Sequence, residues 1–414
     1  VRTATRTALA NLVQLCLSER ASLLLLAGDL YDGDWRDYST GLYFAHQMGR
    51  LREAGVQVVM IRGNHDAASQ ITKSLRLPDN VRELSPRRSE TLHLDDLGLA
   101  IHGQSFATRA VTENLVASYP ERVPALLNIG LLHTSITGRT GHEPYAPYTF
   151  DDLRSKGYDY WALGHVHTTE IVNRDEPWVV FPGNLQGRHA RETGVKGAML
   201  IEYTADGITS VEQRALDVVR YAQCALDVRG DQSFDPGLDR LRPLLEREFA
   251  AADGRVLGMR VHVTGQTALH ARLLADDKFL QEVRVLAQDI AGDELWVDKV
   301  VVQTTPEQRS GAENADAGAI SELLSALLAE RADESVLFEL AAGMSELRSK
   351  LPTELREGDD ALLLDDPAFI GLQLDAALQL LEAKLSGPDV PPPAASPARA
   401  TRALEVRAAE VTES

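Results

Sequence analysis

The stretch YWALGHVHT, from Tyr160 to Thr168, places a glycine and then two histidines directly after a short apolar run. Side chains alternate between the two faces of an extended chain, so His165 and His167 point the same way. Such a pair can bind one metal ion or straddle two. Two solvent-facing histidines near a turn would give the same pattern, although imidazole is the commonest metal ligand. The rest of the chain has to decide between these interpretations.

Three other apolar runs end in the same way, with a small or polar residue followed by a side chain that can bind a metal. The run LLLLAGD ends at Asp29, VVMIRGNHD ends at Asn64, His65 and Asp66, and IGLLHT delivers His133. Ligands of open α/β sheets gather at the carboxyl ends of the strands. The strand ends therefore predict one shared site.

The predicted ligands are carboxylate, amide and imidazole groups, without a thiolate. This mixture of oxygen and nitrogen suits Mn²⁺, iron or Zn²⁺ better than Ca²⁺. One carboxylate can bridge two cations about 3.5–4 Å apart, an arrangement that activates water against a phosphodiester. The pattern is therefore typical of a hydrolytic metal site.

The composition limits the class of protein. A chain of 414 residues with 44% hydrophobic residues predicts two or three domains with substantial cores. Cys16 and Cys224 lie far apart and lack metal-ligand or redox spacing, so we expect no disulfide framework and a cytoplasmic location. No apolar run approaches the length of a membrane span, and we expect neither a signal peptide nor a membrane association.

The net charge of −19 is unevenly distributed. Residues 1–216 hold 22 Lys and Arg against 25 Asp and Glu, a net charge of −3, whereas residues 217–414 hold 20 against 36, a net charge of −16. Phosphate contacts need Lys and Arg, so an acidic protein binds nucleic acids poorly without a local basic surface. A role on DNA would depend on such a surface in the first half.

Hydrophobic pattern and composition divide the chain into five segments. Residues 1–216 alternate apolar runs with amphipathic stretches, including a helical pattern over 38–54, which predicts an α/β domain. Residues 217–303 predict a small α/β module of three strands and two helices. The remaining predictions are a polar linker at 304–319, amphipathic helices at 320–385 and a disordered, Pro- and Ala-rich tail at 386–414.

Four motifs, GDLYDGDW, GNHD, LLHT and GHVH, resemble in their order and spacing those of the calcineurin-like metallophosphoesterases. Within this superfamily the chain most resembles DNA repair exonucleases of the SbcD and YhaO type, bacterial relatives of the nuclease subunit in the double-strand-break repair complex. The segments GNLQGRHARETGVKG and HGQSF favour this branch. The resemblance implies a four-layer α/β sandwich, two mixed sheets flanked by helices, with a capping domain at 217–303.

The resemblance also implies a role for each motif residue. Asp29 would bridge two divalent metal ions, with Mn²⁺ as the expected metal. Asn64, His133 and His165 would complete the ligands of one ion, and His167 would bind the other.

The catalytic residues follow from the same resemblance. His65 would be the catalytic histidine, which stabilises the transition state or protonates the leaving oxygen. Asp66 would orient His65, as a carboxylate partner fixes a histidine tautomer. A metal-bound hydroxide would attack the phosphorus in line.

Two departures from the family pattern count against a simple transfer of these roles. The family has an Asp-x-His motif on its first strand, and this chain begins at Val1, after that point. We expect a truncated sequence, in which Asp29 and His167 alone would hold the second ion weakly. Many relatives also carry a histidine three residues after the bridging aspartate, where this chain has Asp32, whose role stays open.

Basic residues beside the motifs are candidates for contacts with DNA phosphates. They are Arg62, Arg188, His189, Arg191 and Lys196, and the alternative is a solvated basic loop. Two aromatic residues near the predicted bridging aspartate, Tyr31 and Trp35, are core or rim residues, or stack on bases. We expect His102 to be structural.

We therefore predict a metal-dependent phosphodiesterase that acts as an exonuclease on double-stranded DNA ends. One alternative is the same chemistry on a cyclic nucleotide or phosphoprotein, and another is a non-catalytic DNA-end-binding subunit. The helices at 320–385 would either dock on an SbcC-like or Rad50-like ATPase or pack on their own chain, since an amphipathic stripe does not identify its partner. A homodimer is expected from the resemblance alone.

Overall fold

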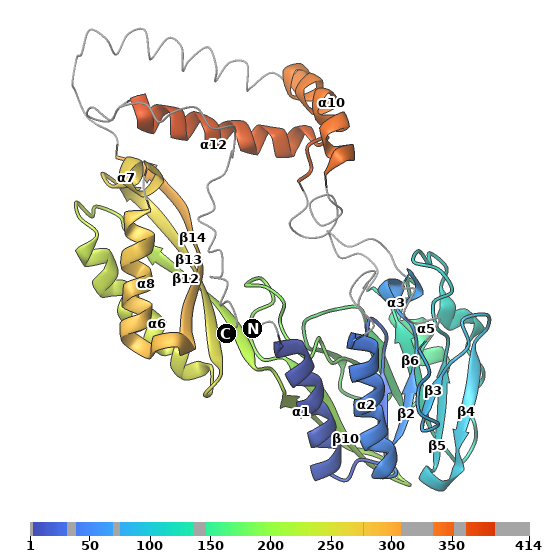
Figure 1. The fold of residues 1–414 in the computed structure, drawn as a ribbon. Coiled ribbons are helices and arrows are strands. Elements are labelled where there is room, and N and C mark those ends of the chain that lie inside the picture. Colours follow the sequence, from blue (N-terminus) through green and yellow to red (C-terminus); the bar gives the residue numbers. More distant parts are fainter. Residues whose placement is uncertain are drawn as a thin grey trace. The chain divides into compact units, whose positions relative to one another are not determined.

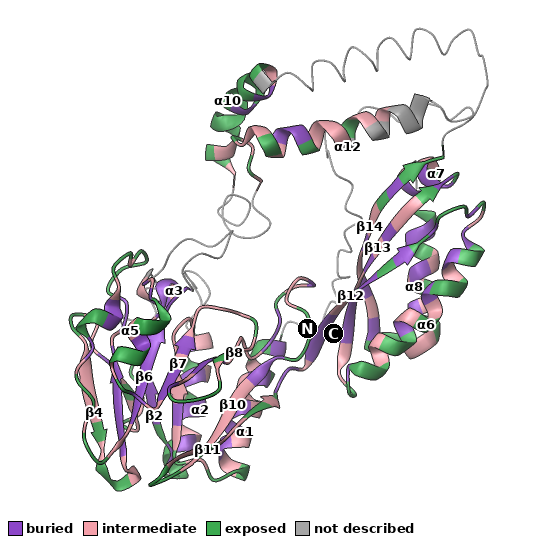
Figure 2. Ribbon diagram, turned by 180° about the vertical axis from the view of Figure 1, so that it is seen from behind, coloured by how far each residue is buried: buried purple, intermediate pink, exposed green. Residues whose placement is uncertain are grey.

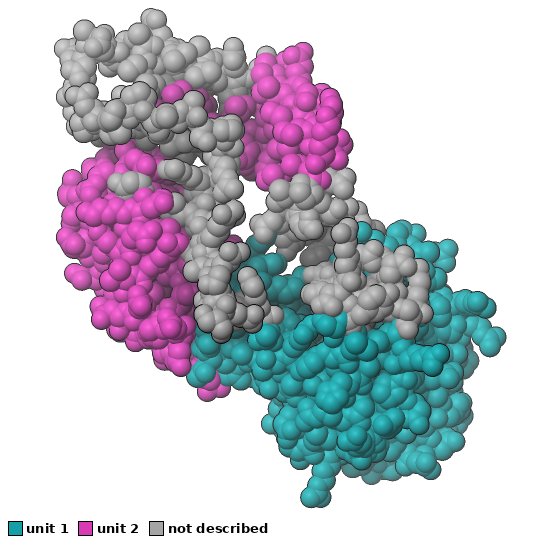
Figure 3. Space-filling view, viewed as in Figure 1, with its two compact units in different colours: residues 1–221, 254–256 teal, residues 222–253, 257–414 magenta. Residues whose placement is uncertain are grey.

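The computed structural model divides into two compact units (Figure 3). Unit 1 comprises residues 1–221 with 254–256, and unit 2 comprises residues 222–253 with 257–414. Within them, the structure describes residues 3–30, 39–68, 75–135, 146–275, 277–307, 334–351 and 362–385.

A small parallel sheet forms one half of unit 1. Its strands β1 (Leu23–Leu26), β2 (Gln57–Met60) and β3 (Val81–Glu83) are hydrogen-bonded in this order. The helices α1 (Ala4–Ser18) and α2 (Ser39–Glu53) lie side by side along one face of it (Figure 1). Parallel strands need a crossover connection, and α2 supplies the one between β1 and β2.

A six-stranded mixed sheet forms the other half of unit 1. Its order is β4-β5-β6-β7-β9-β8, in which β5, β6, β7 and β9 run parallel and the edge strands β4 and β8 run antiparallel to their neighbours. The bounds are β4 (Glu90–Leu94), β5 (Leu99–Gly103), β6 (Leu127–His133), β7 (Tyr160–Gly164), β8 (Glu170–Asn173) and β9 (Trp178–Phe181).

Shorter elements complete unit 1. An antiparallel hairpin joins β10 (Gly197–Thr204) to β11 (Gly207–Ala215). The short helices are α3 (Asn64–Ala68) and α5 (Phe150–Ser155), and the 3-10 turns are η1 (Asp95–Leu97) and η2 (Leu115–Ser118). Helix α5 begins at a capping box, because Thr149 and Asp152 bond reciprocally to each other's main chain.

Unit 1 has three apolar cores: one between the helices α1 and α2 and the small sheet, one between the two sheets, and one on the outer face of the six-stranded sheet. Successive side chains of a strand point to opposite faces, so one strand can contribute to two of these cores. In β1, Leu24 packs with α1 and α2, whereas Leu23 and Leu25 face the core between the sheets. In β7, Tyr160 faces that central core, whereas Trp161 joins the outer core beneath α5 and η2. Figure 2 shows the inner strands β2, β6 and β7 as largely buried. The predicted four-layer α/β arrangement of helices, sheet, sheet and helices is confirmed.

Unit 2 contains a second, smaller α/β arrangement. The strands β12 (Val219–Asp227), β13 (Val256–Thr267) and β14 (Leu295–Pro306) form one sheet in this order, with β13 and β14 parallel. Helices α6 (Asp235–Ala251), α7 (His270–Ala275) and α8 (Lys278–Ala291) pack on it around a single core, and η3 (Gly292–Glu294) leads into β14. The predicted strand–helix–strand–helix–strand order is therefore confirmed, with α7 as an addition.

Two further helices of unit 2 follow in the sequence, α10 (Glu334–Lys350) and α12 (Pro367–Leu385), and they share a small core of Leu337, Ala341 and Ile370. The linker predicted at 304–319 begins too early, because residues 304–306 are the end of β14. The rest of this linker beyond residue 307, the predicted helical segments 320–333 and 352–361, and the tail 386–414 lie outside the described residues. Among the described helices, none combines the length and apolar character needed to cross a bilayer. Cys16 and Cys224 are both buried free thiols.

Candidate metal centre

The turn after β1 presents the Asp29 carboxylate. Asp29 has a φ of +53°, a left-handed conformation that costs a non-glycine residue on the order of 1–3 kcal/mol and that clusters at functional sites. Its Oδ1 accepts a hydrogen bond from the His65 main-chain N–H at 3.1 Å. Its Oδ2 lies 3.3 Å from Nε2 of His133. The carboxylate therefore connects the turn after β1 with the ends of β2 and β6.

His133, the last residue of β6, is fully buried and has a defined orientation. Its Nδ1 lies 2.9 Å from the carbonyl oxygen of Ala27. A carbonyl oxygen can only accept, so Nδ1 carries the hydrogen of the neutral ring and Nε2 keeps its lone pair. This Nε2 lies 2.9 Å from Oδ1 of Asn64 as well as close to Asp29. Acceptor atoms from three residues thus converge, which is the arrangement that a cation satisfies.

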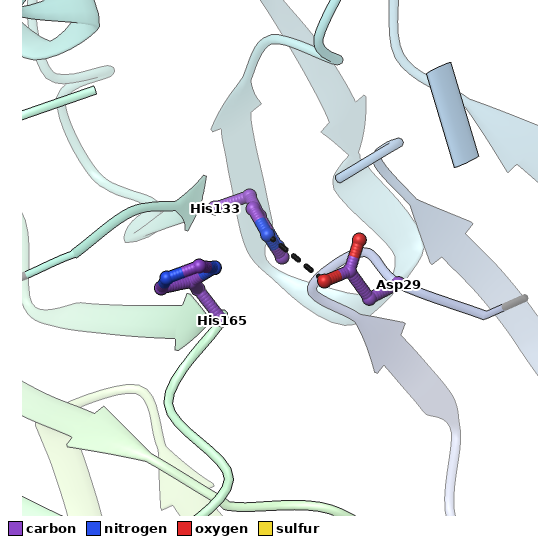
Figure 4. Close-up of side chains that lie close together, drawn as sticks. All are labelled: Asp29, His133 and His165. Atoms are coloured by element: carbon purple, nitrogen blue, oxygen red, sulfur yellow. Dashed lines mark ion pairs between the residues drawn. The ribbon is translucent and has the colours of Figure 1, made fainter. Parts of the chain in front are cut away.

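His165 adds a second imidazole from the turn after β7. Its φ is +96°, and its ring lies edge-on to the His133 ring with 5.3 Å between the centroids. Asp29, His133 and His165 each offer a ligand atom, and these atoms lie within 4.8 Å of one another. Figure 4 shows the three side chains grouped at the ends of their strands. With the Asn64 amide oxygen, this mixed oxygen and nitrogen set fits a borderline divalent cation such as Mn²⁺, iron or Zn²⁺.

Two glycines allow the strand ends to approach this closely. A Cβ on Gly63 would lie 2.2 Å from Oδ1 of Asp29, and a Cβ on Gly164 would lie 1.9 Å from the carbonyl oxygen of Ala27. Both distances are far inside van der Waals contact. The glycines that precede Asn64 and His165 in the motifs therefore bring the two sheets together at the site.

Electrostatics also favours a bound cation. Burial by itself raises the pKa of the Asp29 carboxyl, but the charges and hydrogen bonds of His133 and His65 outweigh it and lower the pKa to about 2. Burial likewise opposes a charge on His133, yet the neighbouring Asp29 carboxylate raises its pKa. The buried pocket thus keeps Asp29 ionised and concentrates negative charge beside the imidazole rings.

Asp66 lies in the short helix α3 and is almost fully buried, with 1% of its surface exposed. Its Oδ1 accepts from the main-chain N–H of Leu30 at 3.0 Å, and its Oδ2 accepts from that of Gly63 at 3.1 Å. The carboxylate therefore holds the turn after β1 against the turn after β2, which fixes the position of Asp29 relative to Asn64. That Asp66 orients the His65 ring stays a prediction.

His167 lies two residues beyond His165, and its partner is a residue that the sequence analysis missed. Nδ1 of His167 lies 2.8 Å from Oε1 of Glu192. Burial raises the pKa of the Glu192 carboxyl, but His167 and Arg188 outweigh it and lower the pKa well below its usual range. In the sequence, Glu192 appears only as one acidic residue in the segment HARETG. Nothing there connects it with His167, because the two residues lie 25 positions apart.

Two of the basic candidates for DNA contacts are engaged with carboxylates. Arg62 pairs with Glu83 at 2.6 Å, and Arg188 pairs with Glu192 at 3.0 Å. Ion pairing does not exclude a phosphate contact, but it lowers the positive charge that these guanidinium groups offer.

The other basic candidates differ in exposure. His189 is about one third exposed, with Nε2 4.0 Å from Oε1 of Glu192, and the main-chain N–H of Arg191 donates to Nδ1 of His189. Lys196 is only 2% exposed, and its Nζ donates to the carbonyl oxygen of His167 at 2.9 Å. Lys196 is therefore neither a surface phosphate contact nor a solvated loop residue, and that interpretation was wrong.

Of the remaining candidates, His102 is a structural residue, and the others lie outside the described part of the chain. His102 is fully buried, bonds to Thr91 Oγ1 and Asn128 Oδ1 through its two ring nitrogens, and stacks on Tyr158. This agrees with the structural role predicted for it. Tyr31, Asp32 and Trp35 lie outside the described residues.

Comparisons with known proteins agree with this geometry. Residues 4–169 match the family model described as calcineurin-like phosphoesterase, and residues 221–305 match the model described as metallophosphoesterase YhaO, middle domain. The chain is 37% identical over 231 residues to a Bacillus subtilis protein called uncharacterized metallophosphoesterase YhaO, which covers 55% of this chain and 56% of that protein.

Archaeal relatives extend the similarity. The DNA double-strand break repair protein Mre11 of Haloferax volcanii is 24% identical over 361 residues, which covers 86% of this chain and 77% of that protein. The Mre11 protein of Sulfurisphaera tokodaii is 25% identical over 224 residues, covering 50% and 56%. The chain thus spans little more than half the length of two of these three relatives. It contains a calcineurin-like phosphoesterase domain followed by a YhaO-type domain, and it is homologous to the YhaO and Mre11 proteins.

Proposed function

We propose that the protein is a metal-dependent phosphodiesterase that acts on double-stranded DNA ends as an exonuclease. The convergence of Asp29, Asn64, His133 and His165 supports the hydrolytic part of this proposal. The match to relatives called DNA double-strand break repair proteins supports the choice of DNA as the substrate.

Each residue of the site has its own proposed role in binding the metal ions. When bound, two divalent cations, with Mn²⁺ preferred, would stabilise the charge of the reacting phosphodiester and activate water. Asp29 would bridge the cations, Asn64, His133 and His165 would hold the first, and His167 would contribute to the second.

His65 is the proposed catalytic histidine, which stabilises the transition state or protonates the leaving oxygen. Its main-chain N–H bonds to the Asp29 carboxylate, so that the histidine and the proposed bridging ligand are held at a fixed separation. Asp66, anchored on the main chain of both turns, keeps this geometry and is the proposed partner of His65.

The wider organisation is proposed on the same basis. Residues 1–216 would form the nuclease domain and 217–303 a capping domain that controls access of DNA. Arg62, Arg188, His189 and Arg191 would line the approach to the site. We further propose a cytoplasmic protein that works as a homodimer or with an SbcC-like or Rad50-like ATPase, to which the helical region would bind.

Degradation of end-labelled linear duplex DNA by the full-length protein in Mn²⁺ tests this function, with a covalently closed circle of the same sequence as the control substrate. We expect release of nucleotides from the linear form alone. His65→Ala should lower the rate by about 10²–10⁴-fold, the range for loss of a general acid, while Mn²⁺ binding persists. His93→Ala, which removes an exposed histidine on β4, is the matched control and should leave the rate unchanged.

The other outcomes discriminate the alternatives. Cleavage of bis-p-nitrophenyl phosphate without degradation of DNA would retain the phosphodiesterase and reject the DNA substrate. Binding of DNA ends without cleavage of either compound would favour a non-catalytic subunit. Full activity of His65→Ala would reject the assigned catalytic histidine.

A further inference from the structure

We propose that Glu192 is a positioning residue that fixes His167 with its ring hydrogen on Nδ1, so that Nε2 is presented as a metal ligand. This inference rests on the proposed two-metal function and adds a residue that lies outside the four metal motifs. A carboxylate behind a metal-binding histidine fixes both the tautomer and the ring orientation, and its loss typically lowers metal affinity about 10–100-fold.

The Glu192 carboxylate is itself rigidly held. Only 8% of its side chain is exposed, against 39% for His167. Its Oε2 accepts from Nδ2 of Asn184 and from the main-chain N–H of Arg188, both at 2.8 Å. Its Oε1 is thereby directed at Nδ1 of His167, 2.8 Å away. A nearly buried group with several bonds can restrain an exposed ring, because its own rotation would break those bonds.

The position of Arg188 decides which tautomer His167 adopts. Nη2 of Arg188 lies 2.9 Å from Nδ1 of His167, and a guanidinium can only donate. If Nδ1 accepted this bond, its lone pair would face the ionised Glu192 oxygen at 2.8 Å, which is repulsive. If Nδ1 carries the hydrogen, it donates to Oε1, and Arg188 still donates to that oxygen through Nη2 at 3.0 Å and Nε at 3.1 Å. The second arrangement satisfies all three groups and leaves Nε2 with its lone pair.

The main chain of His167 is anchored by the same segment that carries Glu192. Nζ of the buried Lys196 donates to the His167 carbonyl oxygen at 2.9 Å. The ring and the backbone of His167 are therefore both held from residues 192–196. Such double anchoring is what a ligand needs when its position has to be defined before the metal binds.

The first test measures the tautomer directly in the metal-free protein, by nitrogen NMR with ¹⁵N-histidine labelling. The His167 signals are identified by their loss in His167→Ala. We expect the neutral His167 ring of wild type to carry its hydrogen on Nδ1, and Glu192→Gln to shift the ring towards the Nε2–H tautomer. Glu90→Gln is the matched control, since Glu90 on β4 also accepts a main-chain bond but lies in a different segment.

The second test measures Mn²⁺ affinity of the full-length protein by calorimetry and electron paramagnetic resonance. Glu192→Gln should weaken one Mn²⁺ site about 10–100-fold and leave the other unchanged. Because Glu192 acts through His167, adding Glu192→Gln to His167→Ala should cause no further loss. A purely structural role would instead give additive losses at both sites and a lower unfolding midpoint.

The outcomes separate this inference from the proposed function. An unchanged tautomer together with unchanged Mn²⁺ affinities in Glu192→Gln would overturn the positioning role, even if the protein degrades DNA. The predicted shift in tautomer and affinity would support it, even if the protein cleaves no DNA. Equal weakening of both sites with a loss of stability would also overturn it.

Discussion

Individual side chains at the site are defined more by main-chain partners than by one another. His133 is oriented by the Ala27 carbonyl, and Asp66 is held by the N–H groups of Leu30 and Gly63. Main-chain groups carry no sequence signal, because every residue except proline has the same pair. The sequence therefore identified Asp29, Asn64, His133 and His165 as a group, but it did not reveal what keeps each of them in place.

The coupling between Asp29 and His133 can be tested at this scale. Because the carboxylate raises the pKa of His133 against the effect of burial, Asp29→Asn should lower that pKa. In wild type the charged ring persists up to a pH above 6.5, the ordinary value for histidine, and in the variant it should lose its proton at a lower pH. An NMR titration of the metal-free protein measures both values.

Asp95→Asn, which removes an exposed carboxylate in η1, should leave the His133 titration unchanged and serves as its control. The upward direction of the His133 pKa shift also predicts how Mn²⁺ binding depends on pH. Below its raised pKa the His133 ring is protonated, so binding must release that proton and weakens as the pH falls. An identical His133 pKa in Asp29→Asn and wild type would contradict the coupling.

Among the structural elements, sequence predicted best those strands that form continuous apolar runs. The runs that became β1, β2, β6 and β7 are continuous apolar segments, because helices cover one face of their sheets and the other sheet covers the second. The strands β3, β4, β5 and β8 were not predicted. Of these, β4 and β8 are partly exposed edge strands that mix polar and apolar residues. The strand β5 is buried along its whole length, but its short run LAIHG includes a histidine and a glycine. Glu192 was missed because loop geometry alone brings it to His167.

The packing between β6 and β7 gives a prediction at the scale of elements. A Cβ on Gly130 would lie 2.3 Å from Cε3 of Trp161, a fully buried ring that also stacks on Tyr158 and Tyr119. The ring cannot retreat into such a core, so Gly130→Ala should lower the free energy of unfolding by about 1–3 kcal/mol. Urea denaturation measures the change.

Gly49→Ala is the matched control, because Gly49 lies in helix α2 and a Cβ there would meet nothing within 4 Å. It should be neutral or stabilise the protein by about 0.5–1 kcal/mol, since alanine favours the helix. A similar loss of stability in both variants would show that the crowding at Trp161 is not the cause.

On the scale of the whole molecule, the two units have separate cores and different charge. The main core of unit 2 takes its residues from Cys224 to Val300, whereas the three cores of unit 1 take theirs from Leu12 to Leu216. Every residue of the candidate metal centre belongs to unit 1. Most of the net charge of −19 falls after residue 216, so electrostatic attraction of DNA would depend on local basic groups of unit 1.

Separate cores predict two unfolding transitions in calorimetry of the full chain, only one of which should respond to Mn²⁺. A ligand that binds the folded state at 100 times its Kd stabilises it by about 2.7 kcal/mol. For a unit of this size each kcal/mol corresponds to a shift of about 2–4 °C in the midpoint. We therefore expect Mn²⁺ to raise the midpoint of the unit 1 transition by several degrees and EDTA to reverse the effect.

Two variants assign the transitions. Leu241→Ala removes a fully buried side chain of α6, so it should destabilise unit 2 by about 2–5 kcal/mol and move the transition that ignores Mn²⁺. His133→Ala removes a proposed ligand and should abolish the response of the other transition to Mn²⁺. A single transition that shifts as a whole in both variants would mean that the units unfold together, and a Mn²⁺ response that survives in His133→Ala would place the metal elsewhere.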